Sequence, residues 1–273
     1  MSDKPKFLLE VGPHSERIEE FCNICDELGF EWKSAENYLV NPDSYQKFNG
    51  SDNVCTFGTL GFVKKIQMKT PLVPGSYCDF NNFKVSTYIN HYYKYMFNLG
   101  VFAPMGYFTK NIPQFMKALG ITDGRFFIRP DGGDKQFTGC VIGMSDTRLV
   151  EYLASRANPN TMCYICPVQE TNNEYRLFMY HDKVVTGSQY RNSSGIHHGP
   201  VNEKTIAAAE SFAAKNWLPE PLWVMDIHED ANGEMSIMEL NSWSCSGWYQ
   251  SDLRKIIEAT ARQMKIDYDN IFN

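Results

Sequence analysis

The sequence predicts a mixed α/β (α+β) protein built from two domains. The N-terminal part alternates a strand pattern with a helix pattern, and the C-terminal half consists mostly of strands that alternate apolar and polar residues. The length of 273 residues is enough for roughly two domains of about 150 residues each. Hydrophobic residues make up 43% of the chain and charged residues 21%, which is ordinary for a globular protein with a sizeable core.

The N-terminal part begins with a short buried strand, KFLLEV, at residues 6–11. A helix is expected from Ser15 to Phe30, with Ser15 as N-cap and Gly29 at the end, because glycine commonly terminates helices. The segment NVCTFGTLGFVKKI predicts a second strand, a turn and the start of a helix. Residues 70–82 contain two prolines and a glycine, so we expect a loop there.

The remaining elements are expected in the following order. Helices are predicted over residues 85–98, 112–119, 146–157, 203–215 and 251–265. Strands are predicted over residues 125–130, 140–144, 162–170, 174–180, 183–191, 222–228 and 234–241. The stretch DGGDKQFTG, between the first two of these strands, is expected to be a flexible loop, and His197-His198 are expected in another.

The clearest functional pattern is the hairpin WVMDIHEDANGEMSIMELN. Asn232-Gly233 favours a two-residue type I′ turn, because that turn needs positive φ at both positions. Counting back from this turn places Asp226 directly opposite Glu239, with Cβ atoms about 5 Å apart. Strand alternation then puts two groups on opposite faces. The polar face holds Asp226, His228, Glu239 and Asn241 with Val224 and Ile237, and the apolar face holds Met225, Ile227, Met238 and Leu240.

Two carboxylates held this close repel each other unless something compensates their charge. Oxygen ligands from Asp226, Glu239 and Asn241 suit a hard cation such as Mg²⁺, whose remaining positions substrate phosphates often fill. Two alternatives stay open at this point. The polar face of an exposed hairpin needs no ligand, and a two-carboxylate glycosidase also fits the spacing. The glycosidase interpretation leaves the basic residues upstream unexplained.

Those basic residues are Arg129, which ends an apolar strand, and Lys135 in the following loop. Arginine offers a planar fork for phosphate oxygens and lysine a mobile charge, while glycines let the loop backbone approach a ligand. The run R-P-D-G-G-D-K matches neither the P-loop nor the dinucleotide fingerprint, and an exposed turn with ordinary charges is the alternative.

The segment EYRLFMYHDKVVTGSQYR predicts another hairpin. A turn at His181-Asp182 would place five polar residues on one face: Glu174, Arg176, Lys183, Gln189 and Arg191. The two arginines then face the same anion as Arg129, or alternatively form cross-strand ion pairs with Glu174.

Composition excludes several other classes. The net charge of −6 argues against a protein that coats nucleic acid. The chain has no signal-peptide pattern and no run of about 18 apolar residues, so we expect a cytoplasmic protein without a membrane partner. Two C-x-x-C pairs, Cys22/Cys25 and Cys163/Cys166, raise the question of zinc. Packing is favoured instead, because Cys22 and Cys25 share an apolar helix face and residues three apart in a strand point to opposite faces.

The order of these pieces resembles the ATP-grasp superfamily. The details are similar to a divergent clade marked by two arginines and a lysine and common in bacteria and phages. The matching stretches are FIRPDGGDKQFTG, EYRLF, SQYR, VMDI and MELNSWSCSGWY. The resemblance covers about residues 85–260. It implies an N-terminal pre-ATP-grasp domain at residues 1–84 and an ATP-grasp domain at 85–273, with a lid subdomain at about 100–165 and a metal-binding subdomain at about 166–273.

The resemblance also implies roles for single residues. Arg129 stands where many ATP-grasp enzymes have a phosphate-contacting lysine, and its being arginine leaves the nucleotide contacts open. Lys135 would reach the phosphates from the lid loop. The run CPVQE would hold adenine through backbone groups near Val168 and the ribose through Glu170, with Glu174 of the next strand also at the nucleotide. Arg176 and Arg191 would act with Lys135 on the transferred phosphate. The ligands of Mg²⁺ would be Asp226, Glu239 and Asn241.

The implied reaction is ATP-dependent ligation of a carboxylate and an amine through an acylphosphate. The substrate would be an amino acid, a peptide or a protein. Phosphoryl transfer needs positioning and charge neutralisation more than a covalent side chain, which suits these residues. Two alternatives remain: a small-molecule kinase that stops after phosphoryl transfer, and an inactive nucleotide-binding protein.

Overall fold

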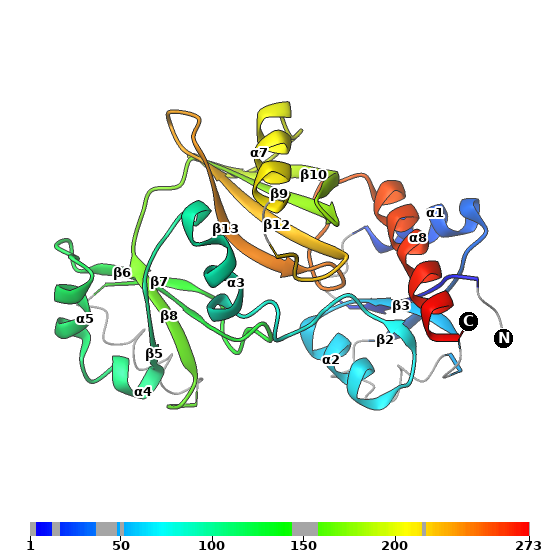
Figure 1. Cartoon of the computed structure of the whole chain (residues 1–273), viewed down its shortest axis with the longest axis horizontal. Coiled ribbons are helices and arrows are strands. Elements are labelled where there is room, and N and C mark those ends of the chain that lie inside the picture. Colours follow the sequence, from blue (N-terminus) through cyan, green and yellow to red (C-terminus); the bar gives the residue numbers. More distant parts are fainter. Residues whose placement is uncertain are drawn as a thin grey trace.

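The computed structural model describes residues 4–12, 17–36, 48–49, 52–143, 158–214 and 217–272. They form three β-sheets with helices packed against them (Figure 1). The predicted mixed α/β class is confirmed. The predicted helix at residues 146–157 lies outside the described residues.

The N-terminal sheet is parallel, with strand order β2-β1-β3-β4. Its elements are β1 (Lys6–Val11), α1 (Ile18–Leu28), β2 (Glu31–Glu36), β3 (Asn53–Phe57), α2 (Leu60–Lys69) and β4 (Val73–Gly75). Strand β1 has buried apolar residues on both faces, and a helix covers each face. Phe7 packs with Phe21 of α1, and Leu8 packs with Phe62 of α2.

Two predictions for this part are wrong in detail. The expected loop at residues 70–82 contains β4, which pairs with β3 although Pro74 has no backbone N–H. The helix expected from Ser15 begins at Ile18 and its N-cap is Arg17, with φ 61° and no side-chain cap bond. Ser15 itself lies outside the described residues. The helix end is confirmed, since Gly29 takes φ 69° as its C-cap.

The middle sheet is antiparallel, with strand order β5-β8-β6-β7. Its elements are β5 (Val101–Pro104), α4 (Met105–Phe108), α5 (Ile112–Ala118), β6 (Arg125–Pro130), β7 (Cys140–Gly143) and β8 (Met162–Pro167). Strand alternation in β8 sends Cys163 into the cluster around Phe126 and Cys166 into the cluster around Tyr88, as predicted for residues three apart.

The third sheet is antiparallel, with strand order β11-β10-β9-β12-β13. Its strands are β9 (Asn173–Tyr180), β10 (Lys183–Asn192), β11 (Gly195–Gly199), β12 (Leu222–Glu229) and β13 (Met235–Ser242). Helix α7 (Glu203–Ala213) covers one face, which buries Leu177 and Met225. The other face buries Phe178 and Val224 beneath α8 (Leu253–Phe272).

Three further elements differ from expectation. The helix predicted over residues 85–98 is α3 (Val85–Tyr92) followed by the 3-10 turn η1 (Tyr93–Tyr95), because Phe97 donates its backbone N–H to Ile237 and leaves the helix (2.8 Å). The expected loop at His197-His198 is strand β11, paired with β10. Helix α8 begins near the predicted position but runs beyond residue 265.

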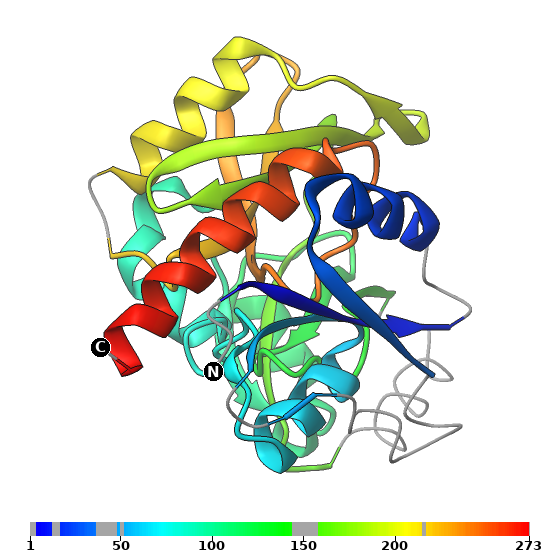
Figure 2. The ribbon, with the colours of Figure 1, turned by 90° about the vertical axis from the view of Figure 1, so that its right-hand side faces the viewer.

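Helix α8, near the C-terminus, packs against the N-terminal part of the chain. It leaves the third sheet and crosses to the N-terminal sheet, where it packs beside α1 and over β3 and β4 (Figure 2). The loop before α8 therefore lies between the third sheet and the N-terminal sheet. Among the described residues, no helix is both long and apolar enough to cross a membrane.

Candidate functional site

Asp226 and Glu239 lie opposite each other in the β12–β13 hairpin, as predicted. The turn that produces this pairing differs from the predicted one. The backbone N–H of Gly233 donates to Asp230 (3.0 Å), and that of Asp230 donates to Glu234 (3.0 Å). Gly233 has φ 78°, but Asn232 does not adopt positive φ. The predicted type I′ turn is therefore wrong, because that turn needs positive φ at both residues.

A β-bulge restores the predicted pairing of Asp226 with Glu239. The register shifts between Asp226 and Ile227, so that Ile227 lies opposite Ile237 and Met238 is the extra residue. Ile237 therefore joins the apolar cluster of Ile227, whereas Met238 lines the same cavity as the two carboxylates. The predicted faces of Ile237 and Met238 were wrong, because strand alternation breaks at a bulge.

Asp226 is held in a bidentate ion pair with Arg176 of β9. Nε and Nη2 of Arg176 donate to its two oxygens at 2.8 and 2.7 Å, and Asn241 Nδ2 donates to Oδ2 at 3.1 Å. Asp226 is 1% exposed. Burial opposes the charge of Arg176, but Asp226 outweighs it and raises the pKa of the guanidinium.

Glu239 is held by a second arginine and a lysine. Arg129 Nη1 lies 2.6 Å from Oε2, and Lys135 Nζ lies 3.6 Å from Oε1. Lys135 also donates to Asn241 Oδ1 at 2.8 Å. Burial alone would raise the pKa of Glu239, but Lys135 and Arg129 outweigh it and hold that pKa well below its ordinary value. Glu239 is therefore ionised at neutral pH.

Lys135 reaches the site from the loop between β6 and β7. Its backbone has φ 44°, and its N–H donates to Gly132 (3.1 Å). The neighbouring Gly133 packs against the chain at Phe80, where an added Cβ would lie 2.7 Å from a backbone oxygen. Glycine is thus needed for the loop to pass this close to the protein.

A cavity of about 530 Å³ opens beside these ion pairs, between the middle and third sheets. Seven of the residues singled out in the sequence line it: Arg129, Lys135, Val168, Glu174, Arg191, Asp226 and Glu239. Apolar side chains line much of the rest, among them Phe127, Tyr88 and Met96. The cavity is thus charged at the carboxylate hairpin and largely apolar elsewhere.

Three other predicted residues do not line this cavity. Arg176 and Asn241 each donate hydrogen bonds to Asp226 and hold it in place. Glu170 is exposed, while its neighbours Gln169 and Thr171 line the cavity. A ribose contact by Glu170 stays a prediction.

The predicted turn at His181-Asp182 is confirmed, since Lys183 pairs with Tyr180. The predicted common face is only partly right, because β10 has two register shifts. Glu174 and Arg191 both line the cavity, whereas Lys183 and Gln189 do not. Lys183 pairs with Glu210 of α7 (3.0 Å) and Gln189 donates to Asn173 (2.9 Å).

The alternative of cross-strand pairing is present in the structure. Arg191 and Glu174 are opposite each other on β10 and β9, and Arg191 Nε lies 4.0 Å from Glu174 Oε1. Arg191 is far more exposed than Glu174, 54% against 6% of the side chain. The guanidinium therefore has freedom to bind an anion in the cavity.

Two tyrosines that no sequence pattern indicated lie over Arg176. The rings of Tyr190 and Tyr249 stack 5.0 Å apart, and the guanidinium carbon of Arg176 lies 5.7 and 5.0 Å from their centres. No local pattern marks this group, because its members come from β9, β10 and the loop before α8.

The side-chain oxygen atoms on the hairpin are suitable ligands for a hard cation. Asp226, Glu239 and Asn241 offer two carboxylates and an amide oxygen within one hydrogen-bonded group. Among the described residues, no cluster of three or more His, Cys, Asp or Glu side chains is suited to a metal. This donor set matches Mg²⁺, which usually takes one or two carboxylates and completes its shell with phosphate and water.

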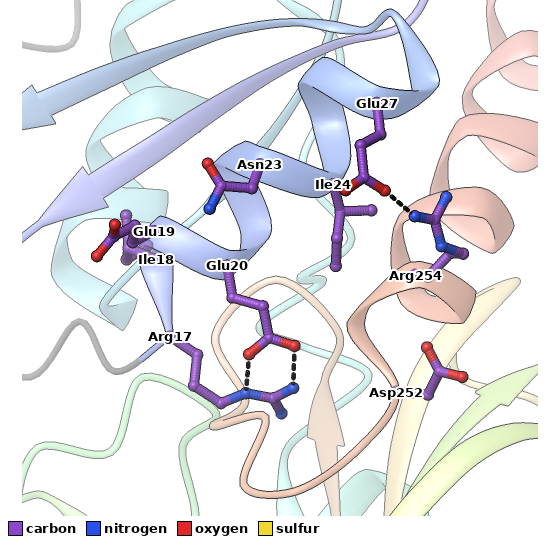
Figure 3. Close-up of a pocket in the computed structure, with 9 residues that line it drawn as sticks. All are labelled: Arg17, Ile18, Glu19, Glu20, Asn23, Ile24, Glu27, Asp252 and Arg254. Carbon is purple, nitrogen blue, oxygen red and sulfur yellow. Dashed lines mark hydrogen bonds and ion pairs between the residues drawn. The ribbon is translucent and has the colours of Figure 1, made fainter.

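A second hollow lies on the surface between α1 and the start of α8 (Figure 3). Each of its two arginines pairs with a glutamate: Arg17 with Glu20, and Arg254 with Glu27. Four acidic side chains and two arginines line this hollow. Because its acidic residues outnumber its cations, it is a weaker candidate for binding a nucleotide than the cavity beside Asp226.

Comparison with known proteins identifies the family of the chain. The model of one ATP-grasp family, the second family of the clade named for two arginines and a lysine, matches residues 115–259. This match spans more than half of the chain and includes every predicted site residue. No curated protein is similar to the chain at the level of sequence.

Solved structures with the same fold include a synthetase and two ligases. D-cycloserine synthetase DcsG has a TM-score of 0.61 at 13% identity, covering 95% of this chain and 99% of its own. D-alanine–D-alanine ligase from Bacillus anthracis complexed with ATP has 0.61 at 11%, covering 99% and 100%. ATP-grasp ligase PsnB complexed with a minimal precursor has 0.58 at 10%, covering 94% and 98%. These identities establish the shared fold alone.

Proposed function

Because this chain belongs to the second ATP-grasp family of the two-arginine, one-lysine clade, we propose that it is an ATP-dependent carboxylate–amine ligase. One observation carries the proposal. Asp226 and Glu239 lie opposite each other at the charged side of a cavity of about 530 Å³, and both carboxylates are paired with cationic side chains. Few functions other than binding a metal–polyphosphate complex require that combination.

ATP fits the polarity of the cavity. Adenine would occupy the apolar region near Phe127, with backbone groups around Val168 as its hydrogen-bonding partners and Glu170 or Glu174 near the ribose. The phosphates would extend towards Arg129 and Lys135. This direction is supported by the separation of an apolar region from a charged one within a single cavity.

Asp226, Glu239 and Asn241 would hold Mg²⁺. When bound, this ion neutralises phosphate charge and helps to align the transferred phosphoryl group. In the structure, the two carboxylates pair with Arg129, Arg176 and Lys135. Two negative and three positive charges leave a net positive site, which favours the phosphates of a nucleotide over neutral ligands.

The reaction proceeds in two displacements. A substrate carboxylate oxygen attacks the terminal phosphorus of ATP, and ADP leaves with the electrons of the broken P–O bond. An amine then attacks the acyl carbon, loses a proton and expels phosphate. Arg176 and Arg191, with Lys135, would stabilise the charge on the phosphoryl group, which is the main catalytic requirement of such a transfer.

The substrate is proposed to be an amino acid, a peptide or a protein. Among proteins of similar structure, PsnB is complexed with a precursor peptide, and the Bacillus anthracis enzyme is a D-alanine–D-alanine ligase. The metal-ligand set and the basic residues are both present in this chain, which favours an active enzyme over an inactive nucleotide-binding protein. A kinase would use the same site but would need no amine.

We expect ADP release to require a carboxylate substrate and phosphate release to require an amine as well. The test is a screen of amino acids and short peptides, singly and in pairs, with ADP and inorganic phosphate measured separately. A ligase releases both products in equal amounts only when both partners are present. ADP release without phosphate, accompanied by a phosphorylated product, would identify a kinase. Failure to use ATP with any pair would argue against the proposal.

A further inference from the structure

The turn that precedes α8 carries a tyrosine in an unusual conformation. The backbone N–H of Ser251 donates to Trp248 (2.9 Å), which closes a four-residue turn. Within it, Tyr249 has φ 47°, a left-handed value that L residues with a large side chain rarely adopt. Such a conformation persists only when surrounding contacts hold it, so the contacts of this turn indicate what it does.

The ring of Tyr249 lies over the guanidinium of Arg176. The ring centre is 5.0 Å from the guanidinium carbon, and Tyr190 stacks on Tyr249 with the two planes 16° apart. Asp226 holds the same guanidinium in its own plane through two hydrogen bonds. Arg176 is thus fixed by contacts in its plane and above it.

Arg17, from the N-terminal domain, holds the turn from the other side. Its Nη1 donates to the carbonyl oxygens of Tyr249 and Ser251 at 2.7 and 2.8 Å. Its Nε and Nη2 donate to the two oxygens of Glu20, each at 2.7 Å (Figure 3). All three nitrogens of one planar fork therefore donate in defined directions, which a lysine cannot reproduce.

A second contact joins the same helix to the same turn. Phe21, one helical turn after Arg17, stacks on Trp248 with ring centres 5.1 Å apart and planes at 21°. Phe21 is fully buried. Arg17 and Phe21 therefore contact the turn at two places, the backbone of Tyr249 and Ser251 and the side chain of Trp248. The strained Tyr249 lies within this contact region.

We propose that Arg17 is a positioning residue, which holds the turn Trp248–Ser251 so that Tyr249 keeps Arg176 aligned with the terminal phosphate of the nucleotide. This inference rests on the proposed function, since it assigns Arg176 to that phosphate. It gives the N-terminal domain a part in phosphate recognition, although Arg17 does not line the cavity beside Asp226.

Loss of Arg17 removes the two hydrogen bonds that oppose relaxation of Tyr249. The backbone then returns to a common conformation, the ring leaves Arg176, and the guanidinium loses one of its two constraints. Binding should therefore weaken for nucleotides that carry a γ-phosphate, such as ATP, and should stay the same for those that lack it, such as ADP. Affinity for ATP relative to ADP is therefore a readout that a merely structural role would not change.

The experiment compares Mg²⁺-adenylyl imidodiphosphate with Mg²⁺-ADP by calorimetry in the full-length protein and in Arg17→Met. We expect Arg17→Met to lower the preference for the triphosphate analogue by about tenfold, since one aligned charge-assisted contact is weakened. Affinity for ADP should change by less than about twofold, because its phosphates do not reach Arg176. An unchanged preference in Arg17→Met would overturn the proposal.

Two sets of variants make the comparison specific. Arg254→Met is the matched control, because Arg254 lines the same hollow and pairs with Glu27 of α1 rather than with the turn (Figure 3). It should keep the wild-type preference, and an equal loss there would contradict the proposal. Tyr249→Phe keeps the ring and should keep the preference, whereas Tyr249→Leu should lose it as Arg17→Met does.

Amide hydrogen exchange separates this inference from the proposed function. Peptides covering residues 245–252 should exchange faster in Arg17→Met than in Arg254→Met, whether or not nucleotide is present. If the wild-type protein bound neither nucleotide, the proposed function would fail, and exchange would still decide whether Arg17 holds the turn. Equal exchange in the two variants would exclude that role.

Discussion

Glu239→Gln is expected to reduce ATP turnover by at least about a hundredfold, since it removes a metal-binding charge while keeping the size of the side chain. Glutamine also fails to neutralise Arg129, which lies 2.6 Å from the present carboxylate and is 14% exposed. The measurement is ADP release at saturating ATP and Mg²⁺, with the substrates found in the screen.

Glu234→Gln provides the matched control for this substitution. Glu234 is on the same hairpin but is exposed at its turn, so its replacement should leave turnover within about twofold of wild type. Circular dichroism and urea unfolding of both variants would show that the fold is retained. Wild-type turnover in Glu239→Gln would remove this residue from the site.

The largest effect on stability is expected at the Arg176–Asp226 pair. The two side chains are 11% and 2% exposed. Arg176→Met alone, or Asp226→Leu alone, should cost about 3–5 kcal/mol of unfolding free energy, because each leaves the other charge buried without its partner. The double variant should be much less destabilised than the sum, since no unpaired charge remains. Urea unfolding of the four proteins measures the coupling.

A surface pair provides the comparison. Lys64 and Asp134 are 2.9 Å apart but 49% and 29% exposed, so Lys64→Met should cost less than about 1 kcal/mol. If the single variants at Arg176 and Asp226 were as mild as Lys64→Met, the pair would not be the buried, charged group described above. Additive costs in the double variant would lead to the same conclusion.

The sequence was sufficient to predict the central pairing, although partly through compensating errors. Asn232-Gly233 marked the hairpin correctly, and Asp226 does lie opposite Glu239. The actual turn is one residue longer than predicted, and the bulge at Met238 removes the resulting offset. Composition gives no signal for such a bulge, because it depends on how the strand fits its neighbour.

Long-range contacts were the other part that could not be predicted. Residues close together in the sequence, such as Arg129 and Lys135, were identified from one motif. Arg17 and Tyr249 are more than 200 positions apart, and they meet because α8 packs against α1 and the N-terminal sheet. Periodicity describes single elements, so it contains no information about which distant segments of the chain come into contact.

Titration calorimetry of the wild-type protein with adenylyl imidodiphosphate, with and without Mg²⁺, tests the central claim most directly. We expect binding of the nucleotide to strengthen by at least about tenfold when Mg²⁺ is present, because Asp226 and Glu239 then bind the ion that the phosphates share. Equal affinity under the two conditions would contradict the assignment of these carboxylates to a metal–nucleotide site.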